Sequence, residues 1–556
     1  MPQHASDFKL LAIKPLKNCD RKYSNNLLPD TLYQFYQDYN FSPNEGPISN
    51  IRITNTHYNI YNDYVQNGRD LKINVLAIVG KNGSGKSSLV ELFYLCAYLV
   101  ASVNDLLPIN ERAPSGKRQA NDLHRIEETL KAEVYYQAKG KYHCIILDRD
   151  YNLNPRSASD SNIRFYDLFG GDRVPLTEFF YTVAVNYSIY GLNESITGTW
   201  LGRLFHKNDG YQTPIVLNPF RDQGTINVNG EMLFAQTRLL SNIRFDEHGV
   251  NEILPGKGVK EIVFVIDKQK LNRPEGHSNK RIFEELESRT GKQRNEIFDL
   301  IYTAMLGEKP DYNSIAQDEW REMSIDYVVT KVIRIAKKYP EYRSFYAESS
   351  KEQVPALSEV EPYLDELKKD MTHITLKLRQ ALNFFRNDPL RLDDDRIRRS
   401  ISKITMQADL FAERYRKNCA KYPERDPMEF VPLAPFTPKA ILEDGEDFYR
   451  MSSGEQQFVH SVQSVLYHIL NLDSVFKYRG IQQKLTYNTI NIIFDEIELY
   501  FHPEYQRKFV AEILKRISEL NTPNIRFINL LFLTHSPFIL SDIPSVNVLH
   551  LENGHV

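Results

Sequence analysis

Residues 74–89 constrain what this chain can fold into more than any other stretch. An apolar run at 75–79 predicts a buried strand, a glycine-rich turn follows it, and a helical apolar pattern begins at Leu89. The turn has the spacing G-x-x-x-x-G-K-[ST] of a phosphate-binding loop, at Gly80, Gly85, Lys86 and Ser87. A chance glycine-lysine turn is the alternative, but the strand before the turn and the helix after it favour the phosphate loop.

This loop predicts a site for a nucleoside triphosphate. Glycines let backbone N–H groups face the phosphates, and the following helix presents its positive end to the same anion. Lys86 is expected to neutralise the β- and γ-phosphates, and the Ser87 hydroxyl is expected to bind Mg²⁺. The residues expected to contact the nucleotide are Gly80, Lys81, Asn82, Gly83, Ser84, Gly85, Lys86, Ser87 and Ser88.

Composition adds few constraints. A length of 556 residues is enough for roughly three to four domains. Because 69 basic residues nearly balance 72 acidic ones, the net charge of −3 gives no polycationic signature for nucleic acid. The four cysteines form no C-x-x-C pair, so neither a zinc site nor a disulfide framework is expected. Without a charged-then-apolar leader or an apolar stretch of about 18 residues, we expect a cytoplasmic protein that does not contact a membrane.

The first part of the chain has further strand signals. The predicted strands lie at residues 8–16, 48–54 and 179–185, and a hairpin is predicted around the turn at 138–141. The aromatic residues between the first two strands favour packing over adenine stacking. Residues 104–122 are polar and predict a loop. Asn186 follows a predicted strand and is a candidate for reaching the metal or the attacking water, although most such residues simply cap the strand.

The composition changes between residues 191 and 431, where long charged helices with few glycines are predicted. Residues 217–224 are typical of a turn, and a short strand is expected at 225–228. Apolar residues recur at alternating spacings of three and four, at Leu364, Leu367, Met371, Ile374, Leu378, Ala381 and Phe385. They predict one amphipathic helix, whose seam of about three heptads suits an ordinary bundle helix at least as well as a dimerising coil.

Residues with a chemical role return near the end of the chain. Residues 452–456, with the sequence Ser-Ser-Gly-Glu-Gln, precede a helical pattern, and such a helix N-terminus suits an anion. A buried strand at 489–494 runs into Asp495 and Glu496, and another at 527–533 ends just before His535. We expect Asp495 to hold Mg²⁺, Glu496 to deprotonate the attacking water and His535 to donate to the γ-phosphate. A final strand is expected at residues 546–551.

In this order, the motifs resemble those of the ATP-binding-cassette ATPases of the SMC, Rad50, RecF and OLD branch. The resemblance implies an α/β fold, a P-loop ATPase head with a mixed sheet, built from residues 1–190 and 431–556 around a large, mainly helical insertion at 191–430. Two departures stand out. Met451 takes a position that often holds Leu, and no clear glutamine matches the family's Q-loop, for which Asn186 is the candidate.

The resemblance also implies a shared site between two copies. ATP and Mg²⁺ bound by one head would be closed over by the signature segment of a second head. That segment consists of Ser452, Ser453, Gly454, Glu455 and Gln456. An ATP-sandwich dimer, or a higher even oligomer, is therefore expected.

Residues 13–16, 32–36 and 217–229 narrow the resemblance to PtuA, the ATPase family of Septu and retron-associated antiphage defence systems. That family implies an HNH nuclease partner of the PtuB type and, in retron versions, a reverse transcriptase with its RNA–DNA hybrid, msDNA. The ATPase would restrain the nuclease until phage infection. The long heptad arrays of SMC and Rad50 proteins are missing from the sequence.

Two other function classes stay open. A RecF-like repair ATPase acting directly on DNA would need a basic face, for which the clusters at residues 396–403 and 414–421 are candidates, although such clusters are most often solvated helix faces. The ATPase of a membrane transporter is the last alternative. The middle region is large for a transporter head, and the sequence after Glu496 is atypical of one.

Overall fold

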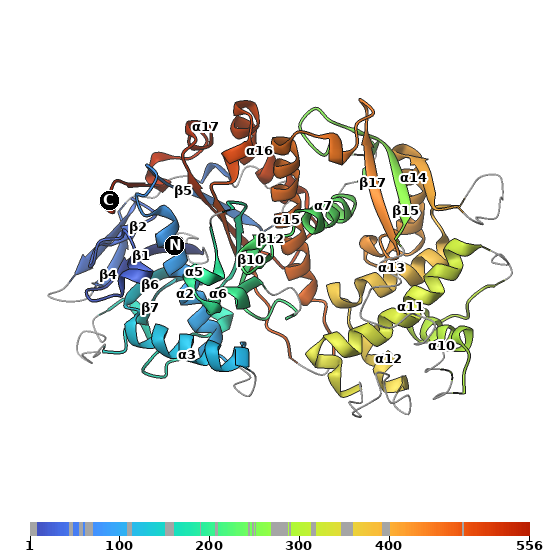
Figure 1. Ribbon diagram of the computed structural model, residues 1–556, viewed down its shortest axis with the longest axis horizontal. Coiled ribbons are helices and arrows are strands. Elements are labelled where there is room, and N and C mark those ends of the chain that lie inside the picture. The colour runs from blue at the N-terminus through green and yellow to red at the C-terminus, as the bar shows by residue number, and fades with distance from the viewer. Residues whose placement is uncertain are drawn as a thin grey trace. The chain divides into compact units, whose positions relative to one another are not determined.

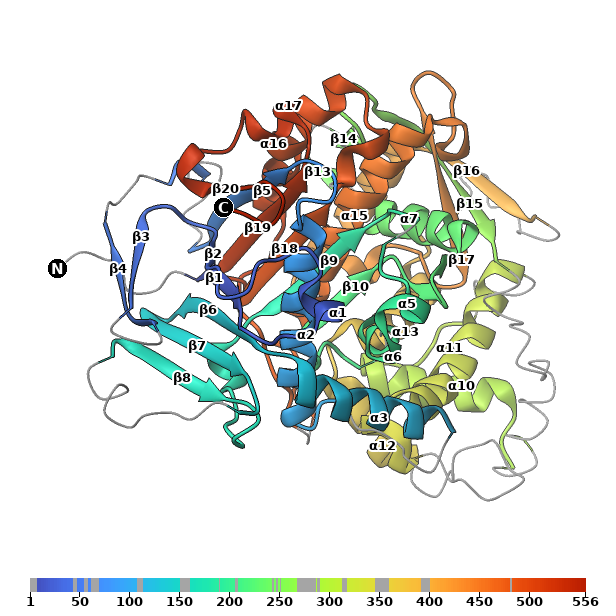
Figure 2. The ribbon, with the colours of Figure 1, turned by 60° about the vertical axis from the view of Figure 1, so that its left-hand side comes forward.

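The strands that precede the polar residues singled out above pair into one sheet. The protein is described by a computed structural model, which covers residues 8–43, 48–54, 59–61, 70–107, 114–150, 161–189, 191–205, 209–242, 245–246, 249–250, 252–267, 287, 291–312, 318–345, 360–391, 401–480 and 483–556. The sheet has the strand order β10 (Ile215–Asn218), β9 (Tyr181–Asn186), β18 (Thr489–Asp495), β19 (Phe527–Thr534), β5 (Lys72–Gly80) and β20 (Val548–Leu551). Every pairing between these strands is parallel, and Figure 2 shows β19 between β18 and β5.

Because the sheet is parallel, the carboxyl ends of all its strands lie at the same edge of the sheet. Asp495, the last residue of β18, lies directly opposite Asn186, the last residue of β9. On the other side of β18, β19 continues beside β5 up to the pair Thr534 and Val79. The glycine-rich loop, Asp495 and His535 therefore share the carboxyl edge of the sheet, which is where open α/β sheets bind ligands.

A row of buried polar side chains crosses the middle of this sheet. Thr182, Asn491, Asn529 and Asn74 lie opposite one another on four neighbouring strands. Asn529 donates through Nδ2 to Asn491 Oδ1 (2.8 Å) and accepts at Oδ1 from the Tyr36 hydroxyl (2.8 Å). A shift of one residue in register would turn these amides to the opposite face, so the row helps to fix the register.

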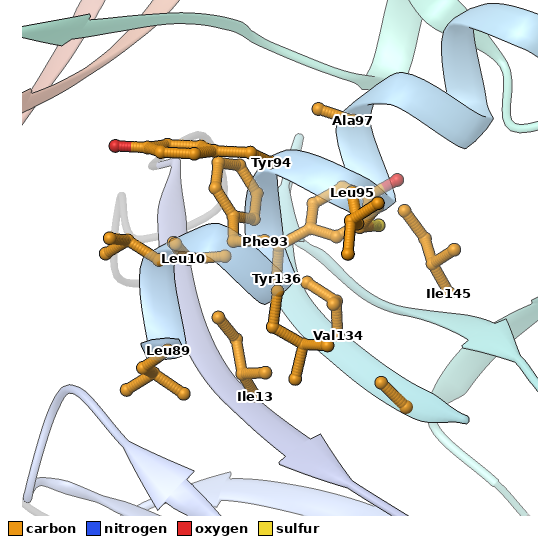
Figure 3. Packing of buried hydrophobic residues seen from close by; sticks show 14 of the residues in the cluster. Leu10, Ile13, Leu89, Phe93, Tyr94, Leu95, Ala97, Val134, Tyr136 and Ile145 are labelled. Carbon is orange, nitrogen blue, oxygen red and sulfur yellow. The ribbon is translucent and has the colours of Figure 1, made fainter. Parts of the chain in front are cut away.

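Helices cover both faces of the sheet. On one face, α2 (Lys86–Val103) starts at the glycine-rich loop and packs against β1 (Lys9–Pro15), β6 (Ala132–Ala138) and β7 (Lys141–Leu147), as Figure 3 shows. On the other face, α16 (Pro503–Glu519) packs its Phe509 against Phe494 of β18, with ring centroids 5.4 Å apart. In the described part of the chain, α2 is the one helix long and apolar enough for a membrane span, and 72% of it is buried in the protein core.

A second sheet holds the N-terminal region, in the order β2 (Tyr33–Gln34), β1, β6, β7 and β8 (Ile163–Asp167). The predicted hairpin is confirmed as the antiparallel pair β6 and β7, and β8 pairs with β7 in parallel. A separate hairpin joins β3 (Tyr39–Pro43) to β4 (Ile48–Ile53). Parallel and antiparallel pairings thus lie mostly in different sheets.

The aromatic stretch near the N-terminus packs into the core, as predicted. The aromatic side chains of this stretch are all buried, namely Tyr23, Tyr33, Phe35, Tyr36 and Tyr39. One prediction for this part of the chain is wrong. The expected loop at 104–122 contains the start of α3 (Pro114–Thr129), a helix whose polar residues face solvent and whose Ile126 is buried. Residues 108–113 lie outside the described residues.

The remaining short elements of this part surround the sheet. They are α1 (Arg21–Ser24), α5 (Glu194–Thr197), α6 (Thr199–Gly202), β11 (Arg221–Asp222), β12 (Thr225–Ile226) and α17 (Pro537–Leu540). The predicted turn at 217–224 is only partly confirmed, since Leu217 and Asn218 belong to the edge strand β10 and a β11–β12 hairpin follows. The short apolar run 215–217 was too brief to indicate a strand by itself.

The chain folds as two compact units. The sheets above belong to the first, which comprises residues 1–228, 464–473 and 485–556, and the second comprises 229–463 and 474–484. The elements of the second unit are α7 (Val228–Asn242), β13 (Phe245–Asp246), β14 (Gly249–Val250), β15 (Val259–Ile266), α10 (Arg294–Leu306), α11 (Glu319–Lys338), α12 (Val360–Lys369), α13 (His373–Asn387), β16 (Lys403–Gln407), α14 (Ala408–Lys421) and β17 (Phe436–Leu442), and α15 (Ser453–Val475) starts in it (Figure 1).

The second unit combines helices with a small sheet that the sequence did not predict. Its strands β16, β15 and β17 pair antiparallel, with β15 in the middle. The expected single helix through residues 364–385 is also wrong, because the chain breaks between α12 and α13. Thr372 caps α13 by accepting from Ile374 N. The apolar positions on both helices are buried in the unit's own core, as in an ordinary bundle.

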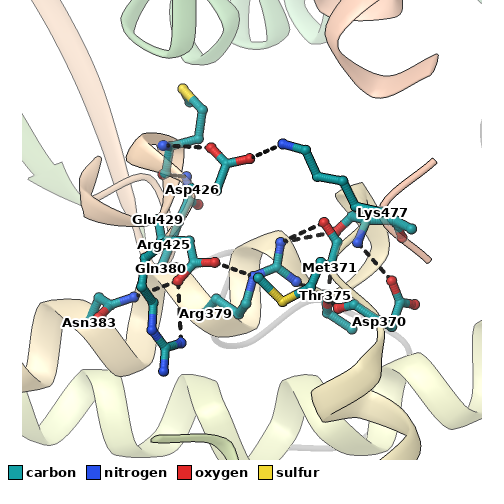
Figure 4. A network of polar contacts seen from close by, with 12 residues as sticks. Asp370, Met371, Thr375, Arg379, Gln380, Asn383, Arg425, Asp426, Glu429 and Lys477 are labelled. Atoms are coloured by element: carbon teal, nitrogen blue, oxygen red, sulfur yellow. Dashed lines mark hydrogen bonds and ion pairs between the residues drawn. The ribbon is translucent and has the colours of Figure 1, made fainter. Parts of the chain in front are cut away.

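A buried polar network holds that break in place (Figure 4). Arg379 of α13 binds Glu429 through Nε (2.7 Å) and donates from Nη1 to the carbonyl of Asp370 (2.8 Å). Asn383 donates to the other Glu429 oxygen (3.0 Å). Since each charge is paired and hydrogen-bonded, the network is structural, and removal of one partner would leave an uncompensated buried charge.

Candidate functional site

The glycine-rich loop, residues 80–86, joins β5 to α2 with a tightly packed backbone. Gly85 stands just before the helix at φ 104°, a conformation that glycine adopts without strain. A Cβ on Gly80 would lie 2.2 Å from the Leu551 carbonyl oxygen, so only glycine fits there. From outside, Asn26 Nδ2 donates to Gly83 O (2.7 Å) and Gly554 N donates to Ser84 O (3.1 Å). Two loop carbonyls are thus occupied, while the first N–H groups of α2 have no acceptor within the helix.

Three chemically active side chains meet at this loop. Lys86 is 4% exposed, and its Nζ donates to Gly80 O (3.0 Å) and lies 2.7 Å from His535 Nε2. The same His535 nitrogen is 3.2 Å from Glu496 Oε1, which is 3.8 Å from Lys86 Nζ. His535 Nε2 can accept a hydrogen bond from the Lys86 ammonium or donate one to the Glu496 carboxylate. The position of the proton on the imidazole therefore decides which of the two hydrogen bonds forms. Burial lowers the Lys86 pKa, against the charges of Glu496, Asp495 and Glu498.

Glu496 reaches this cluster through an unusual backbone conformation. It has φ 49° and ψ 42°, the left-handed region, which costs a residue with a side chain about 1–2 kcal/mol. The turn follows directly on β18, and its Glu496 N–H donates to Leu533 O of β19 (2.9 Å). Strain of this kind persists where the surroundings fix it, and it is common at functional sites.

Asp495 is 5% exposed and held by Asn186. The Asn186 amide donates from Nδ2 to Asp495 Oδ2 (2.7 Å) and accepts at Oδ1 from Ser188 N (2.8 Å). Asn186 thus lies where the sequence suggested, but its amide nitrogen faces the carboxylate. In this arrangement it orients Asp495, and it would have to turn its amide to bind a metal through oxygen.

A second carboxylate lies on the same side of the sheet. Glu91 lies one helical turn after Ser87 on α2. Its negative charge, like that of Glu496, repels the charged form of Asp495. Burial, reinforced by those two charges and opposed by the Asn186 hydrogen bond, raises the pKa of Asp495 to about 7. Burial alone raises the pKa of Glu91 to about 7. The site therefore carries unbalanced carboxylates, which a cation would stabilise.

Arg221 is a site residue that the sequence motifs did not indicate. It is 3% exposed, and its Nη2 donates to the carbonyls of Asn186 and Ser188 (2.8 Å each) and approaches Asn186 Oδ1 (3.3 Å). Arg221 lies in the β11–β12 hairpin, which follows β10, and its hydrogen bonds hold the end of β9 in position. Burial lowers the pKa of its guanidinium to about 10, against the charge of Asp495. Its sequence signals were its place shortly after a short apolar run and inside residues 217–229, a stretch that carries the family resemblance but gave Arg221 no role.

The residues present fit Mg²⁺ and a nucleotide. Asp495 Oδ1 is buried and has no hydrogen-bond partner among the described residues, and the same holds for Ser84 Oγ in the loop. Carboxylate and hydroxyl oxygens are what Mg²⁺ takes from P-loop proteins, so Asp495 and the exposed Ser87 would hold the ion. Successive N–H groups at the start of α2, with Lys86, would take phosphate oxygens.

The signature segment lies in the second unit, at the start of α15. Ser452 and Glu455 form a reciprocal cap, in which Ser452 N donates to Glu455 Oε2 (2.9 Å) and Glu455 N donates to Ser452 Oγ (3.3 Å). Glu455 is also paired with Lys257 (3.0 Å), and Gln456 Nε2 donates to the Met451 carbonyl (3.0 Å). Glu455 and Gln456 thus shape the segment, while Ser452 and Ser453 are exposed.

The first unit brings together most of the predicted site residues. Lys86, Glu496 and His535 are in mutual contact, with Asp495 and Asn186 paired beside them. Lys81 and Asn82 are exposed on the loop, where Lys81 makes a long ion pair with Glu552 (3.6 Å). Besides Arg221, the sequence reasoning gave no role to Glu91, which is partly exposed, or to Glu498, which is buried in a segment that resembles the family's D-loop.

Comparisons with known proteins add no identity. A scan against models of protein families finds no match, and a search of curated proteins also finds none.

Proposed function

We propose that this protein binds ATP with Mg²⁺ at the carboxyl edge of its parallel sheet and hydrolyses it, as a P-loop ATPase of the ABC type. One observation carries the proposal. Lys86 precedes Glu496 and His535 by more than 400 residues in the sequence. In the structure, polar atoms of the three side chains lie within 4 Å of one another. A phosphate-binding cation, a base and a proton donor at the end of a glycine-rich loop are the groups that phosphoryl transfer to water needs.

The chain's own residues suggest how the reaction proceeds. Lys86 would leave Gly80 O and His535 for phosphate oxygens of the substrate, because an ammonium binds anionic oxygens more strongly than a carbonyl. Glu496 would then take a proton from the attacking water, and His535 would donate from Nε2 to the γ-phosphate. Mg²⁺, when held by Ser87 and Asp495, supplies positive charge that offsets the charge of the phosphates.

We further propose that two copies close over ATP, which Ser452, Ser453 and Gly454 would contact in trans. The reciprocal cap between Ser452 and Glu455 supports this, because it holds two exposed serines at the positive end of a long helix. The resulting assembly would be a dimer or a higher even oligomer.

The cellular role we propose follows from the PtuA resemblance. A cytoplasmic ATPase of this kind would restrain a separate HNH nuclease of the PtuB type until infection, and in a retron version it would assemble with a reverse transcriptase and msDNA. Direct action on DNA has less support from the basic clusters. The described residues of 414–421 include Lys417 paired with Glu413 (2.6 Å) and Arg414 bound to the Pro389 carbonyl (3.1 Å). Residues 392–400, with most of the other cluster, lie outside the described residues.

Lys86→Ala tests the proposed ATP site, with Lys117→Ala as a control, since Lys117 is an exposed lysine on α3 of the same unit and away from the loop. ATP at about 100 times its dissociation constant should raise the free energy of unfolding of the wild type by about 2.7 kcal/mol. This gain and MgATP hydrolysis should be lost in Lys86→Ala and kept in Lys117→Ala. Equal ATP affinity in Lys86→Ala and the wild type would refute the site. Purification from the native host, with identification of bound protein and nucleic acid, tests the partners, and a complex with DNA alone would favour the repair ATPase.

A further inference from the structure

A closed ring of hydrogen bonds surrounds the backbone of His535. Glu498, two residues after Glu496, accepts at Oε1 from the Thr534 hydroxyl and from His535 N (3.0 Å). Thr534 Oγ1 in turn accepts from Ser536 N (2.9 Å), and Ser536 Oγ donates to Gln506 Oε1 (2.6 Å). Gln506 Nε2 closes the ring by donating to the carbonyls of Phe501 (3.1 Å) and Glu498 (3.5 Å).

The ring connects two neighbouring elements of the chain with the end of a strand about 30 residues later. Glu498 lies in the short helical turn Ile497–Tyr500, Gln506 lies on α16, and Thr534 ends β19. Each side chain in the ring is both placed by a neighbour and places the next one, so the position of His535 depends on all of them. The turn that carries Glu498 begins directly after Glu496, so the ring also ties His535 to the segment of the candidate base.

Glu498 is the charged member of this ring. It is 6% exposed, and its Oε2 is buried without a hydrogen-bond partner among the described residues. Burial of a carboxylate costs free energy unless hydrogen bonds or opposite charges compensate it. The two hydrogen bonds that the Glu498 carboxylate accepts come from Thr534 and His535. Charge-assisted hydrogen bonds are about twice as strong as neutral ones, so this carboxylate is the strongest restraint on the His535 peptide.

We propose that Glu498 is a positioning residue that fixes His535 in line with Lys86 and Glu496. The inference rests on the proposed ATPase function. Through the N–H of His535 it sets the direction in which the imidazole leaves the backbone, and hence the 2.7 Å approach of Nε2 to Lys86 and its 3.2 Å approach to Glu496. Glu498 does not touch substrate itself in this account. It acts only through His535.

A kinetic double-mutant cycle on the purified full chain tests this role. Glu498→Gln keeps the size of the side chain and removes its charge, and Thr534→Val removes the other end of the contact. Each should lower kcat for MgATP hydrolysis about ten- to a hundredfold, because small misplacements of a reacting group have effects of this size. KM should change less than about twofold, because the phosphate-binding loop is intact. Glu504→Gln, an exposed acid paired with Lys508 in the same segment, should match the wild type.

Coupling to His535→Ala separates positioning from a merely structural role. If Glu498 acts through His535, Glu498→Gln should change kcat little in the His535→Ala background. Multiplying reductions, or an unchanged kcat in Glu498→Gln, would overturn the inference while ATP hydrolysis by the wild type stands. A wild type that neither binds nor hydrolyses ATP would overturn the proposed function and this inference with it. Where Glu498→Gln fails to fold, the same cycle with Thr534→Val decides.

Discussion

The substitution Asp495→Asn is expected to stabilise the protein at neutral pH while removing the carboxylate that we propose holds Mg²⁺. Asp495 is buried beside Glu496 and Glu91, and its pKa rises from an ordinary 3.8 to about 7. In the unfolded chain the carboxyl loses its proton near pH 4, so between pH 4 and 7 the unfolded state binds fewer protons than the folded one. Stability therefore falls as the pH rises through this window.

The size of the effect follows from the shift. About three pKa units at 1.36 kcal/mol each correspond to about 4 kcal/mol lost between pH 4 and pH 7. The amide introduced by Asp495→Asn would keep the size and one hydrogen bond of the side chain and lose the charge, so the variant should be about 2 to 4 kcal/mol more stable than the wild type at pH 8. Glu91, whose pKa is also raised to about 7, should retain part of the pH dependence until Glu91→Gln is added.

Urea unfolding at pH 5, 6, 7 and 8 without nucleotide or Mg²⁺ measures this, with Glu504→Gln as an exposed acid control. Adding MgATP should then stabilise the wild type and leave Asp495→Asn much less affected, because the variant lacks the carboxylate that would hold the ion. Equal stability of the two proteins at pH 5 and a gain at pH 8 are the expected pattern. A variant less stable than the wild type at pH 8 would refute the claim that Asp495 is an unbalanced buried charge.

Three further substitutions test other parts of the site. Glu496→Gln should bind ATP and hydrolyse it at least about a hundredfold more slowly, measured by phosphate release, and wild-type turnover would exclude Glu496 as the base. Ser453→Arg should leave the fold of the single chain unchanged but prevent ATP-dependent dimerisation, and normal dimerisation by light scattering would contradict contact in trans. Arg221→Met should weaken Mg²⁺-dependent nucleotide binding about tenfold, because Arg221 orients Asn186 beside Asp495, the carboxylate that we propose binds the metal. Arg203→Met, which removes another buried arginine of the same unit, should lower stability without changing the Mg²⁺ dependence.

The predictions from sequence were most accurate where the chemistry is local. The strand, the glycine-rich turn and the helix around Lys86 follow from neighbouring residues, and so does the buried strand that ends at Asp495. Local patterns failed where a single residue changed the outcome. Thr372 starts a new helix inside an apolar repeat that otherwise continues through the break, so one expected helix became α12 and α13. In the second unit, β15 pairs with β16 and β17, which lie more than 100 residues later in the chain, so these strands could not be recognised alone.

The parts of the site that sequence could not supply are the contacts that orient its reactive groups. No motif assigns a role to Arg221 or Glu498, and each acts on a backbone segment brought close by the sheet, at Asn186 and His535. The ligand limits which residue types and spacings a motif can have. Supporting residues such as Arg221 and Glu498 need only fit the segment that they orient, so many residue types and spacings can serve. Their identities become visible only when the register of the sheet is known.

That register links stability to chemistry in this fold. The buried amides of Asn491 and Asn529 hydrogen-bond across β18 and β19, four residues before the paired residues Asp495 and Leu533. Since side chains alternate between faces, a slip of one residue would move Asp495 to the face covered by α16 and away from Asn186. The polar row would lose its partners in the same slip, at a cost of about 1–3 kcal/mol for each unsatisfied group. The geometry around Lys86 thus depends on the distant amides of Asn491 and Asn529. Their hydrogen bond favours the one strand register that brings the site residues together at the carboxyl edge.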